Sequence, residues 1–124
     1  IRQQNQKQQG KMTIRLDIDP ETDLSDIPEK TGFVFYRIVQ ECINNALKHA
    51  KASLIEVLIY IENDELHLTI IDDGKGFDPE MKFQGIGLLI LRERAKSLNG
   101  TLQINSAPDK GTEVCVIIPL NGVN

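Results

Sequence analysis

Residues 53–72, SLIEVLIYIENDELHLTIID, decide the fold. They contain two runs rich in Ile, Leu and Val, residues typical of strands, on either side of Asn63-Asp64. Asn and Asp tolerate the positive φ angles that a two-residue hairpin turn requires. The stretch therefore predicts two antiparallel strands, at residues 53–62 and 65–72, joined by a tight turn.

On the N-terminal side, one more strand and a long helix are expected. Apolar and polar residues alternate over residues 12–18, which is typical of a half-buried strand, and Asp19-Pro20 ends the pattern. A helix from about Glu29 to Ala50 is predicted because apolar residues recur there at helical spacing, namely Phe35, Ile38, Val39, Cys42, Ala46 and Leu47.

On the C-terminal side, a glycine-rich segment, a second helix and two more strands follow. The segment 72–87 holds four of the nine glycines. A helix is then marked by Leu88, Leu91, Ala95 and Leu98, and Asn99-Gly100 is a typical helix end. Strands are predicted at residues 101–106 and 112–120, joined by the turn PDKG at 108–111.

This order of elements favours one sheet covered on one face by helices, that is, a two-layer α+β sandwich. The length of 124 residues is that of a single domain, which we place at residues 12–124. Residues 1–11, IRQQNQKQQGK, carry a single apolar side chain. Two interpretations of them remain: a disordered tail, or the stub of a helix from a preceding domain.

Composition argues against several classes of protein. The formal net charge of -4 disfavours a nucleic-acid binder, although backbone N–H groups can still bind an anion. The two cysteines, Cys42 and Cys115, lie inside apolar runs, which disfavours a disulfide framework and fits a reducing compartment. His49 and His67 are too far apart to suggest a zinc site. No apolar run approaches the ~20 residues of a membrane span, and the polar start does not resemble a signal peptide.

The first candidate site lies on the long helix, in the run ECINNALKH at residues 41–49. At about 100° per residue, Glu41, Asn45, Lys48 and His49 fall within one sector of the helix, away from its apolar face. A carboxylate, a carboxamide, an ammonium and an imidazole together offer a metal ligand, a base and phosphate donors. The alternative is a solvated helix face with a Glu41–Asn45 hydrogen bond.

Two glycine-containing motifs form the other candidates. In DDGKGF, residues 72–77, an acidic side chain at a strand end would accept hydrogen bonds from an amine, while the glycines let a planar ligand approach the backbone. In GIGL, residues 85–88, glycines at a helix start expose N–H groups that suit a phosphate. The chain contains neither the P-loop pattern nor the dinucleotide fingerprint. Each motif taken alone is also compatible with an ordinary turn.

Taken in order, the motifs resemble a known family. ECINNALKHA resembles the N box of the GHKL ATPase superfamily, DDGKGFD its G1 box and GIGL its G2 box, and GTEVCVIIP looks like its closing strands. The runs RIVQECINNALKHAKAS and GLLILRERAKSLNGTLQINSAPDKGT are similar to the catalytic domains of nitrate-sensor-type sensor histidine kinases. The resemblance, from about Met12 to Leu120, implies a Bergerat-type ATP-binding fold with a mixed sheet of about five strands.

The resemblance also implies roles for the helix residues. Asn45 would ligate the Mg²⁺ that bridges the phosphates of ATP, with the carboxylate of Glu41 nearby, either behind the direct metal ligands or as a base. Lys48 and His49 would reach the phosphates.

For the loop residues, the resemblance places Asp72 at the adenine amino group and Thr112 as its support through a hydroxyl or a water. Gly74 and Gly76 would line the adenine pocket, and Gly85 and Gly87 would sit at the phosphates. Residues 78–84 would form the ATP lid.

The implied function is transfer of the ATP γ-phosphate to a histidine on a separate dimerisation domain, followed by signalling to a response regulator. Neither His49 nor His67 fits that acceptor role. The resemblance further implies a cytoplasmic domain whose only link to a membrane would be through upstream segments. Two alternatives remain: a regulatory protein serine kinase like an anti-sigma factor, and a nucleotide-sensing interaction module.

Overall fold

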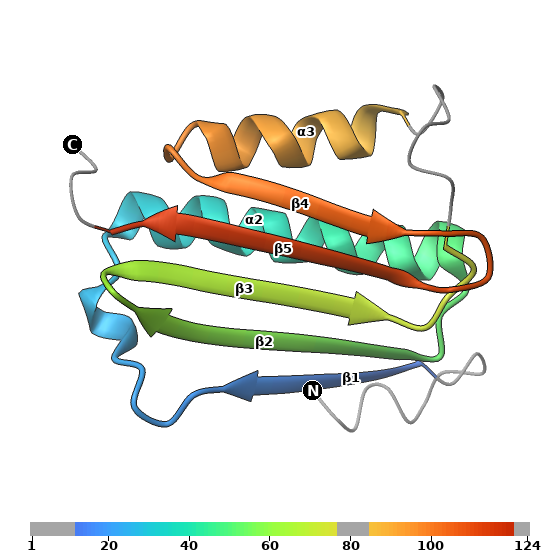
Figure 1. Ribbon diagram of the computed structural model, residues 1–124, viewed down its shortest axis with the longest axis horizontal. Coiled ribbons are helices and arrows are strands. Elements are labelled where there is room, and N and C mark those ends of the chain that lie inside the picture. The colour runs from blue at the N-terminus through green and yellow to red at the C-terminus, as the bar shows by residue number, and fades with distance from the viewer. Residues whose placement is uncertain (1–11, 77–84, 121–124) are drawn as a thin grey trace.

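The computed structural model describes residues 12–76 and 85–120. Five strands form one sheet in the order β1-β2-β3-β5-β4, and helices α2 and α3 lie on one face of it (Figure 1). The elements are β1 (Thr13–Ile18), the 3-10 helix η1 (Leu24–Asp26), α2 (Glu29–Asn45), the π-helical turn η2 (Ala46–Ala50), β2 (Leu54–Glu62), β3 (Glu65–Asp72), α3 (Gly85–Lys96), β4 (Thr101–Ser106) and β5 (Thr112–Pro119). The predicted two-layer α+β class with a mixed five-stranded sheet is confirmed.

The hairpin predicted from residues 53–72 is present as β2 and β3. The two strands pair antiparallel from Ile55 opposite Asp72 to Glu62 opposite Glu65. Asn63 and Asp64 form the turn with φ angles of 55° and 61°. These angles are those of a tight hairpin turn whose twist matches the flanking strands.

Two helical crossovers bring one end of several elements together. β1 and β2 are parallel and are joined through α2. β3 and β4 each pair antiparallel with β5, so they run parallel to one another and are joined through α3. As a result, the carboxyl ends of β3 and β4, the start of β5, the start of α3 and the C-terminal part of α2 lie at the same end of the molecule (Figure 1).

The long helix differs from the prediction near its end. The α-helical part covers Glu29–Asn45, and Ala46–Ala50 form a wider π-helical turn that Lys51 ends in the left-handed conformation with φ 54°. A π turn changes the angular spacing of side chains. The one-sector argument for Glu41 and Asn45 therefore does not extend unchanged to Lys48 and His49.

The core lies between the sheet and the two helices. Its fully buried members come from every layer and include Ile38, Ile55, Leu66, Leu68, Leu91, Leu98, Val116 and Ile118. Each such side chain contributes about 1.5–3 kcal/mol when it leaves water. In the part of the chain that the structure describes, no helix covers the opposite face of the sheet (Figure 1).

On that uncovered face, His67 has a structural partner. It lies opposite Tyr60 in the β2–β3 register, and the two rings stack with centroids 4.5 Å apart at 6°. Cys42 and Cys115 are free, in agreement with the predicted absence of a disulfide framework. Neither described helix combines the length and the apolar composition needed to cross a bilayer.

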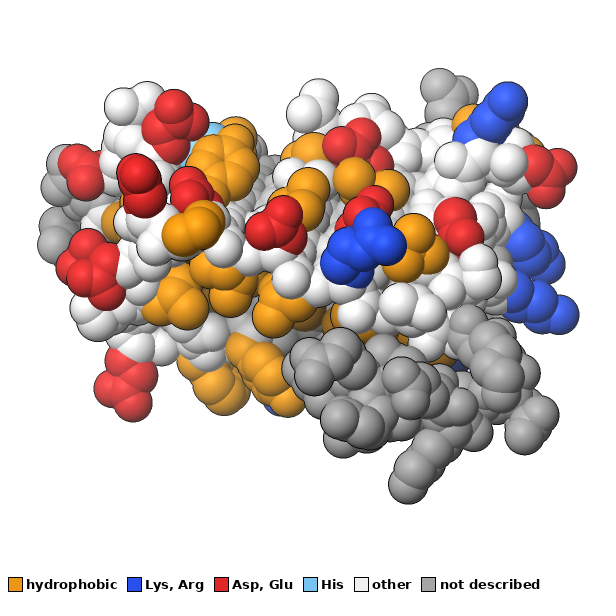
Figure 2. All heavy atoms as spheres, turned by 90° about the horizontal axis from the view of Figure 1, so that it is seen from below, with side chains coloured by type: hydrophobic (Ala, Val, Ile, Leu, Met, Phe, Trp, Pro, Cys, Tyr) orange, Lys and Arg blue, Asp and Glu red, His pale blue; other side chains and the backbone are white. Residues whose placement is uncertain are grey.

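Charge is distributed unevenly over the surface. Seen from the β1 edge, acidic side chains are spread over most of the visible face, whereas most Lys and Arg side chains lie at one end (Figure 2). This is the end at which β3 and β4 terminate (Figure 1). Acidic side chains are also visible at this end, so positive and negative groups are mixed there (Figure 2).

Candidate functional site

The carboxylate of Asp72 lies at the end of the sheet where β3 and β4 terminate. It stands at the last residue of β3, half-buried, and its Oδ1 accepts a hydrogen bond of 2.8 Å from the backbone N–H of Gly74. Burial raises the pKa of Asp72, the N–H of Gly74 opposes this shift, and the charge of Asp73 adds to it. A carboxylate that has lost contact with water is stabilised by hydrogen-bond donors, and an exocyclic amine in the site would provide one.

Asp73, the next residue, has a structural role that the sequence pattern did not reveal. Its Oδ1 accepts from the N–H groups of Ser53 (2.8 Å) and Leu54 (3.0 Å), and its Oδ2 accepts from the hydroxyl of Ser53 (2.6 Å). These hydrogen bonds lower the pKa of Asp73 below its ordinary value, with the Ser53 hydroxyl as the largest cause. Asp73 thereby ties the end of β3 to the start of β2.

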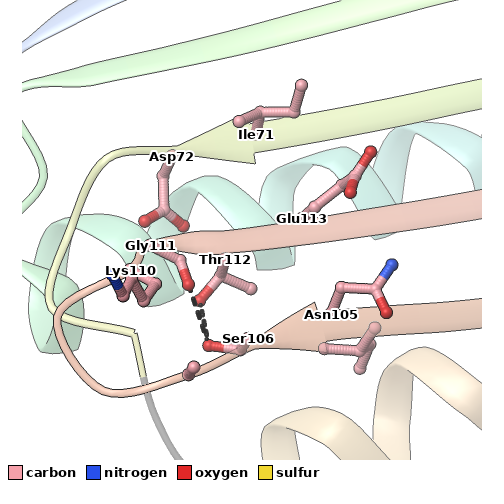
Figure 3. A pocket seen from close by; sticks show the side chains of 10 residues that line it. Ile71, Asp72, Asn105, Ser106, Lys110, Gly111, Thr112 and Glu113 are labelled. Carbon is pink, nitrogen blue, oxygen red and sulfur yellow. Dashed lines mark hydrogen bonds between the residues drawn. The ribbon is translucent and has the colours of Figure 1, made fainter.

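A cavity of about 560 Å³ lies beside Asp72 at the ends of β3, β5 and β4 (Figure 3). Its walls consist of Ile71, Asp72, Ile104, Asn105, Ser106, Ala107, Lys110, Gly111, Thr112 and Glu113. The hydroxyls of Ser106 and Thr112 point toward each other from adjacent strands, 2.9 Å apart (Figure 3). Most of these residues are polar or charged, and a cavity of this size can hold a small molecule.

The glycines around the cavity allow backbone segments to meet closely. Gly76 has φ 66°, and a Cβ there would collide with the carbonyl oxygen of Ala107 and lie 2.8 Å from that of Gly111. Gly111 has φ 78°, and a Cβ there would collide with the carbonyl oxygen of Asp72. The backbone N–H of Asp109 also donates to the carbonyl of Lys75. The segment after Asp72 is thus held against the β4–β5 turn.

The α2 residues approach this site from the helix layer. Glu41 and Asn45 are half-buried and Lys48 is exposed. Burial, followed by the charges of Glu41 and Asp72, raises the pKa of Cys42 to about 12, so the middle of α2 lies within electrostatic reach of Asp72. None of the α2 residues belongs to the walls of the cavity itself.

The structure describes some of the other predicted site residues and not the rest. Gly85 and Gly87 lie in the first turn of α3, at the same end of the molecule as Asp72 (Figure 1). The side chain of His49 and the predicted lid at residues 78–84 lie outside the described residues. Gly74 donates to Asp72, and Thr112 lies opposite Asp72 in the β3–β5 register. Of these residues, Asp72 and Thr112 line the cavity, while Gly74 lies beside Asp72 and Gly76 lies against the β4–β5 turn.

The residues present fit a magnesium-bound nucleotide. Among the described residues, no group of three or more His, Cys, Asp or Glu side chains forms a metal cluster, so a metal would need ligand phosphates as well. Within the same residues, the carboxamide of Asn45 makes no hydrogen bond to the protein, and the predicted alternative of a Glu41–Asn45 bond is not seen. The carboxamide oxygen is thus available as one ligand of a hard cation.

The family model and the relatives that this chain matches all name histidine kinases. The family model described as "Histidine kinase-, DNA gyrase B-, and HSP90-like ATPase" matches residues 33–122. Sensor histidine kinase LiaS of Bacillus subtilis is 38% identical over 106 residues, which cover 83% of this chain and 29% of that protein. The histidine-protein kinase/phosphatase DegS of the same species is 35% identical over 116 residues, covering 90% and 30%. The chain thus spans less than a third of these relatives.

Solved structures show the same architecture. The histidine kinase domain of the blue-light activated histidine kinase from Erythrobacter litoralis EL346 superposes with a TM-score of 0.74 at 26% identity, covering 90% of this chain and 53% of that one. The histidine kinase AdeS of Acinetobacter baumannii gives a TM-score of 0.73 at 19% identity, covering 97% and 59%, and supports the fold alone.

Proposed function

The chain belongs to the family of histidine kinase-, DNA gyrase B- and HSP90-like ATPases, and from this premise we propose that it is the ATP-binding catalytic domain of a sensor histidine kinase. It would donate the γ-phosphate of ATP to a histidine on a separate dimerisation domain. The named relatives are sensor kinases, so the serine-kinase and interaction-module alternatives are not favoured.

The desolvated carboxylate of Asp72 beside the cavity carries the proposal. Its position at the last residue of β3 points an acceptor into a space large enough for a purine. The N–H of Gly74 donates to this carboxylate and holds it in place. Burial leaves the carboxylate of Asp72 with fewer water molecules as donors, and the amino group of adenine would donate a hydrogen bond in their place.

The remaining residues would act on the phosphates. Asn45 would hold Mg²⁺, which when bound neutralises phosphate charge and orients the γ-phosphate. Lys48, exposed on the turn after α2, would pair with phosphate oxygens. Glu41 is half-buried one turn before Asn45 and would accept the proton of the incoming imidazole. Gly85 and Gly87 would offer backbone N–H groups at the start of α3.

The proposal extends to the partners. A histidine-bearing dimerisation domain and a downstream response regulator would complete a two-component system, and the names of the relatives, a sensor histidine kinase and a signal transduction histidine-protein kinase/phosphatase, support a role in signalling. We place the domain in the cytoplasm, where ATP is available.

The test mixes the purified chain with a separately produced histidine hairpin of a sensor kinase and ATP labelled at the γ-phosphate. Acid-labile label on the hairpin is the expected result, because phosphohistidine is hydrolysed by acid. Calorimetric titration with ADP and Mg²⁺ checks binding independently of transfer. The Asn45→Asp variant should keep ADP affinity in the absence of magnesium and lose magnesium-dependent transfer.

The alternatives give different outcomes in the same assay. Acid-stable label on a protein partner would indicate a serine kinase. Nucleotide binding without any transfer would indicate an interaction module. Absence of nucleotide binding would overturn the proposal.

A further inference from the structure

The side chain of Asp73 holds the segment that follows the π-helical turn η2. Its carboxylate accepts from the backbone N–H groups of Ser53 (2.8 Å) and Leu54 (3.0 Å) and from the hydroxyl of Ser53 (2.6 Å). The backbone N–H of Asp73 in turn donates to the carbonyl of Leu54 at 3.2 Å. We call these four contacts the Asp73 clamp. Through them, the residue after Asp72 fixes the entry to β2.

Backbone contacts connect the Asp73 clamp to η2. The N–H groups of Lys51 and Ala52 both donate to the carbonyl of Ala46, the first residue of the turn. Ala46 and Ala52 are 3% and 8% exposed, so both ends of this segment pack into the core. The next two N–H groups along the chain are those that Asp73 binds. The turn and the clamp are therefore one continuous unit.

The conformation of this unit needs support from outside it. A π-helical turn is rare, and it occurs mostly at functional sites. Lys51 ends the turn in the left-handed conformation with φ 54°, which costs about 1–3 kcal/mol for a residue other than glycine and persists only where the surroundings hold it. The Asp73 clamp, which begins two residues later, supplies such a hold.

The position of η2 matters for the groups that we assign to the phosphates. Asn45 is the last residue of α2, directly before the turn, and Lys48 lies within the turn. Asp72, which we assign to the base, is the immediate neighbour of Asp73. The Asp73 clamp thus links the base side of the site to its phosphate side across two segments that are 20 residues apart in the sequence.

We propose that Asp73 is a positioning residue for the phosphate side of the site: its clamp holds η2, and with it Asn45 and Lys48, in a fixed position relative to Asp72. This inference rests on the proposed function, since it assumes that a nucleotide spans the site. Contacts with the base need only Asp72 and its surroundings. Contacts with the phosphates and Mg²⁺ also need η2, so they alone depend on the clamp.

The test measures ADP affinity by calorimetric titration with Mg²⁺ and again with a chelator, and the ratio of the two affinities is the readout. Wild type should bind ADP more tightly with Mg²⁺. In Asp73→Ala the ratio should fall about 10- to 100-fold, the usual effect of losing a group that orients a metal ligand. A residue that only stabilises the fold would leave the ratio of the folded protein unchanged. In hydrogen exchange, the amides of Lys51 and Ala52 should lose protection in Asp73→Ala.

Asp23 offers a matched control at the other end of the molecule. It also holds a serine, since its Oδ1 accepts from the N–H (3.0 Å) and the hydroxyl (2.6 Å) of Ser25. It follows the carboxyl end of β1, which is opposite to that of β3 because β1 is parallel to β2 and β2 is antiparallel to β3. Asp23→Ala should leave the ratio unchanged.

Two further variants grade the effect of the Asp73 clamp. Asp73→Asn keeps a carbonyl oxygen for both backbone N–H groups and should retain most of the wild-type ratio. Ser53→Ala removes only the hydroxyl contact and should lower the ratio less than Asp73→Ala does.

The outcomes that would overturn the inference are distinct from failure of the proposed function. An unchanged ratio in folded Asp73→Ala, or an equal fall in Asp23→Ala, would overturn it, as would a wild-type chain whose ADP affinity does not respond to Mg²⁺. If Asp73→Ala lacks the wild-type circular dichroism spectrum, Ser53→Ala carries the test, and an unchanged ratio there overturns the inference instead. If the wild-type chain binds no ADP at all, the proposed function itself has failed.

Discussion

Asp72 and Asp73 are adjacent in the chain, yet the protein displaces their pKa values in opposite directions. Burial beside the cavity raises the pKa of Asp72, whereas hydrogen bonds from Ser53, its hydroxyl first, lower the pKa of Asp73. The ionised carboxylate of Asp72 therefore destabilises the folded protein, whereas that of Asp73 stabilises it. A destabilised group in a cavity is typical of a functional site.

Replacing Asp72 by Asn should reduce binding while increasing stability. Its folded pKa is raised above the ordinary 3.8, so its stability contribution is fully present below that pH and is lost as the pH rises through the raised value. At pH 7, Asp72→Asn should thus unfold at a higher temperature than wild type, and below about pH 3.8 the difference should vanish. ADP affinity should fall at least about hundredfold, since the amine loses its charged acceptor. Unchanged ADP affinity would rule out the adenine assignment.

Replacing Asp73 by Ala should lower stability with little effect on the base contacts. The loss of the bonds from Ser53 and Leu54 should cost about 1–2 kcal/mol in urea unfolding at pH 7. The folded pKa is lowered, so the contribution is present above pH 3.8 and is lost as the pH falls through the lowered pKa. Asp17→Ala, an exposed carboxylate on β1, is the control and should change stability by less than about 0.5 kcal/mol. Equal effects of the two variants would contradict the role of Asp73.

Adding a methyl group at Gly76 should be far more damaging than adding one at Gly32. Gly76→Ala places a Cβ against the carbonyl of Ala107 at a positive φ, which should cost roughly 2–4 kcal/mol and displace the β4–β5 turn. Gly32→Ala lies inside α2, where its Cβ would be 3.8 Å from Cγ2 of Ile27, and should stabilise by about 0.5–1 kcal/mol. Thermal unfolding monitored by circular dichroism measures both. Stability of Gly76→Ala equal to wild type would show that the close approach is absent.

Two leucines near α3 provide a measure of the core. Leu98 is 0% exposed and Leu89 is 58% exposed. Leu98→Ala should reduce the free energy of unfolding by about 2–5 kcal/mol, because it leaves a cavity between helix and sheet. Leu89→Ala should change it by less than about 0.5 kcal/mol. Similar losses for both variants in urea titrations would indicate that α3 packs differently.

Local patterns in the sequence were enough to predict the elements. Alternation and turn residues located the β2–β3 hairpin, and the apolar spacing located both helices, because these signals depend on neighbours within a few positions. The order of the glycine motifs also predicted which family the chain belongs to. The end of the long helix was the exception, since the π-helical turn at Ala46–Ala50 departs from the regular spacing that the prediction assumed.

The sequence by itself thus determined the fold class, the strands and helices, and the candidate residues from Glu41 to Thr112. Only the tertiary structure decided which of the two adjacent aspartates faces the cavity, why Gly76 and Gly111 must lack side chains, and that the hydroxyls of Ser106 and Thr112 meet across two strands. The physical reason is distance along the chain. Desolvation, cross-strand register and close backbone approach arise between residues that are remote in sequence and meet only when the sheet has formed.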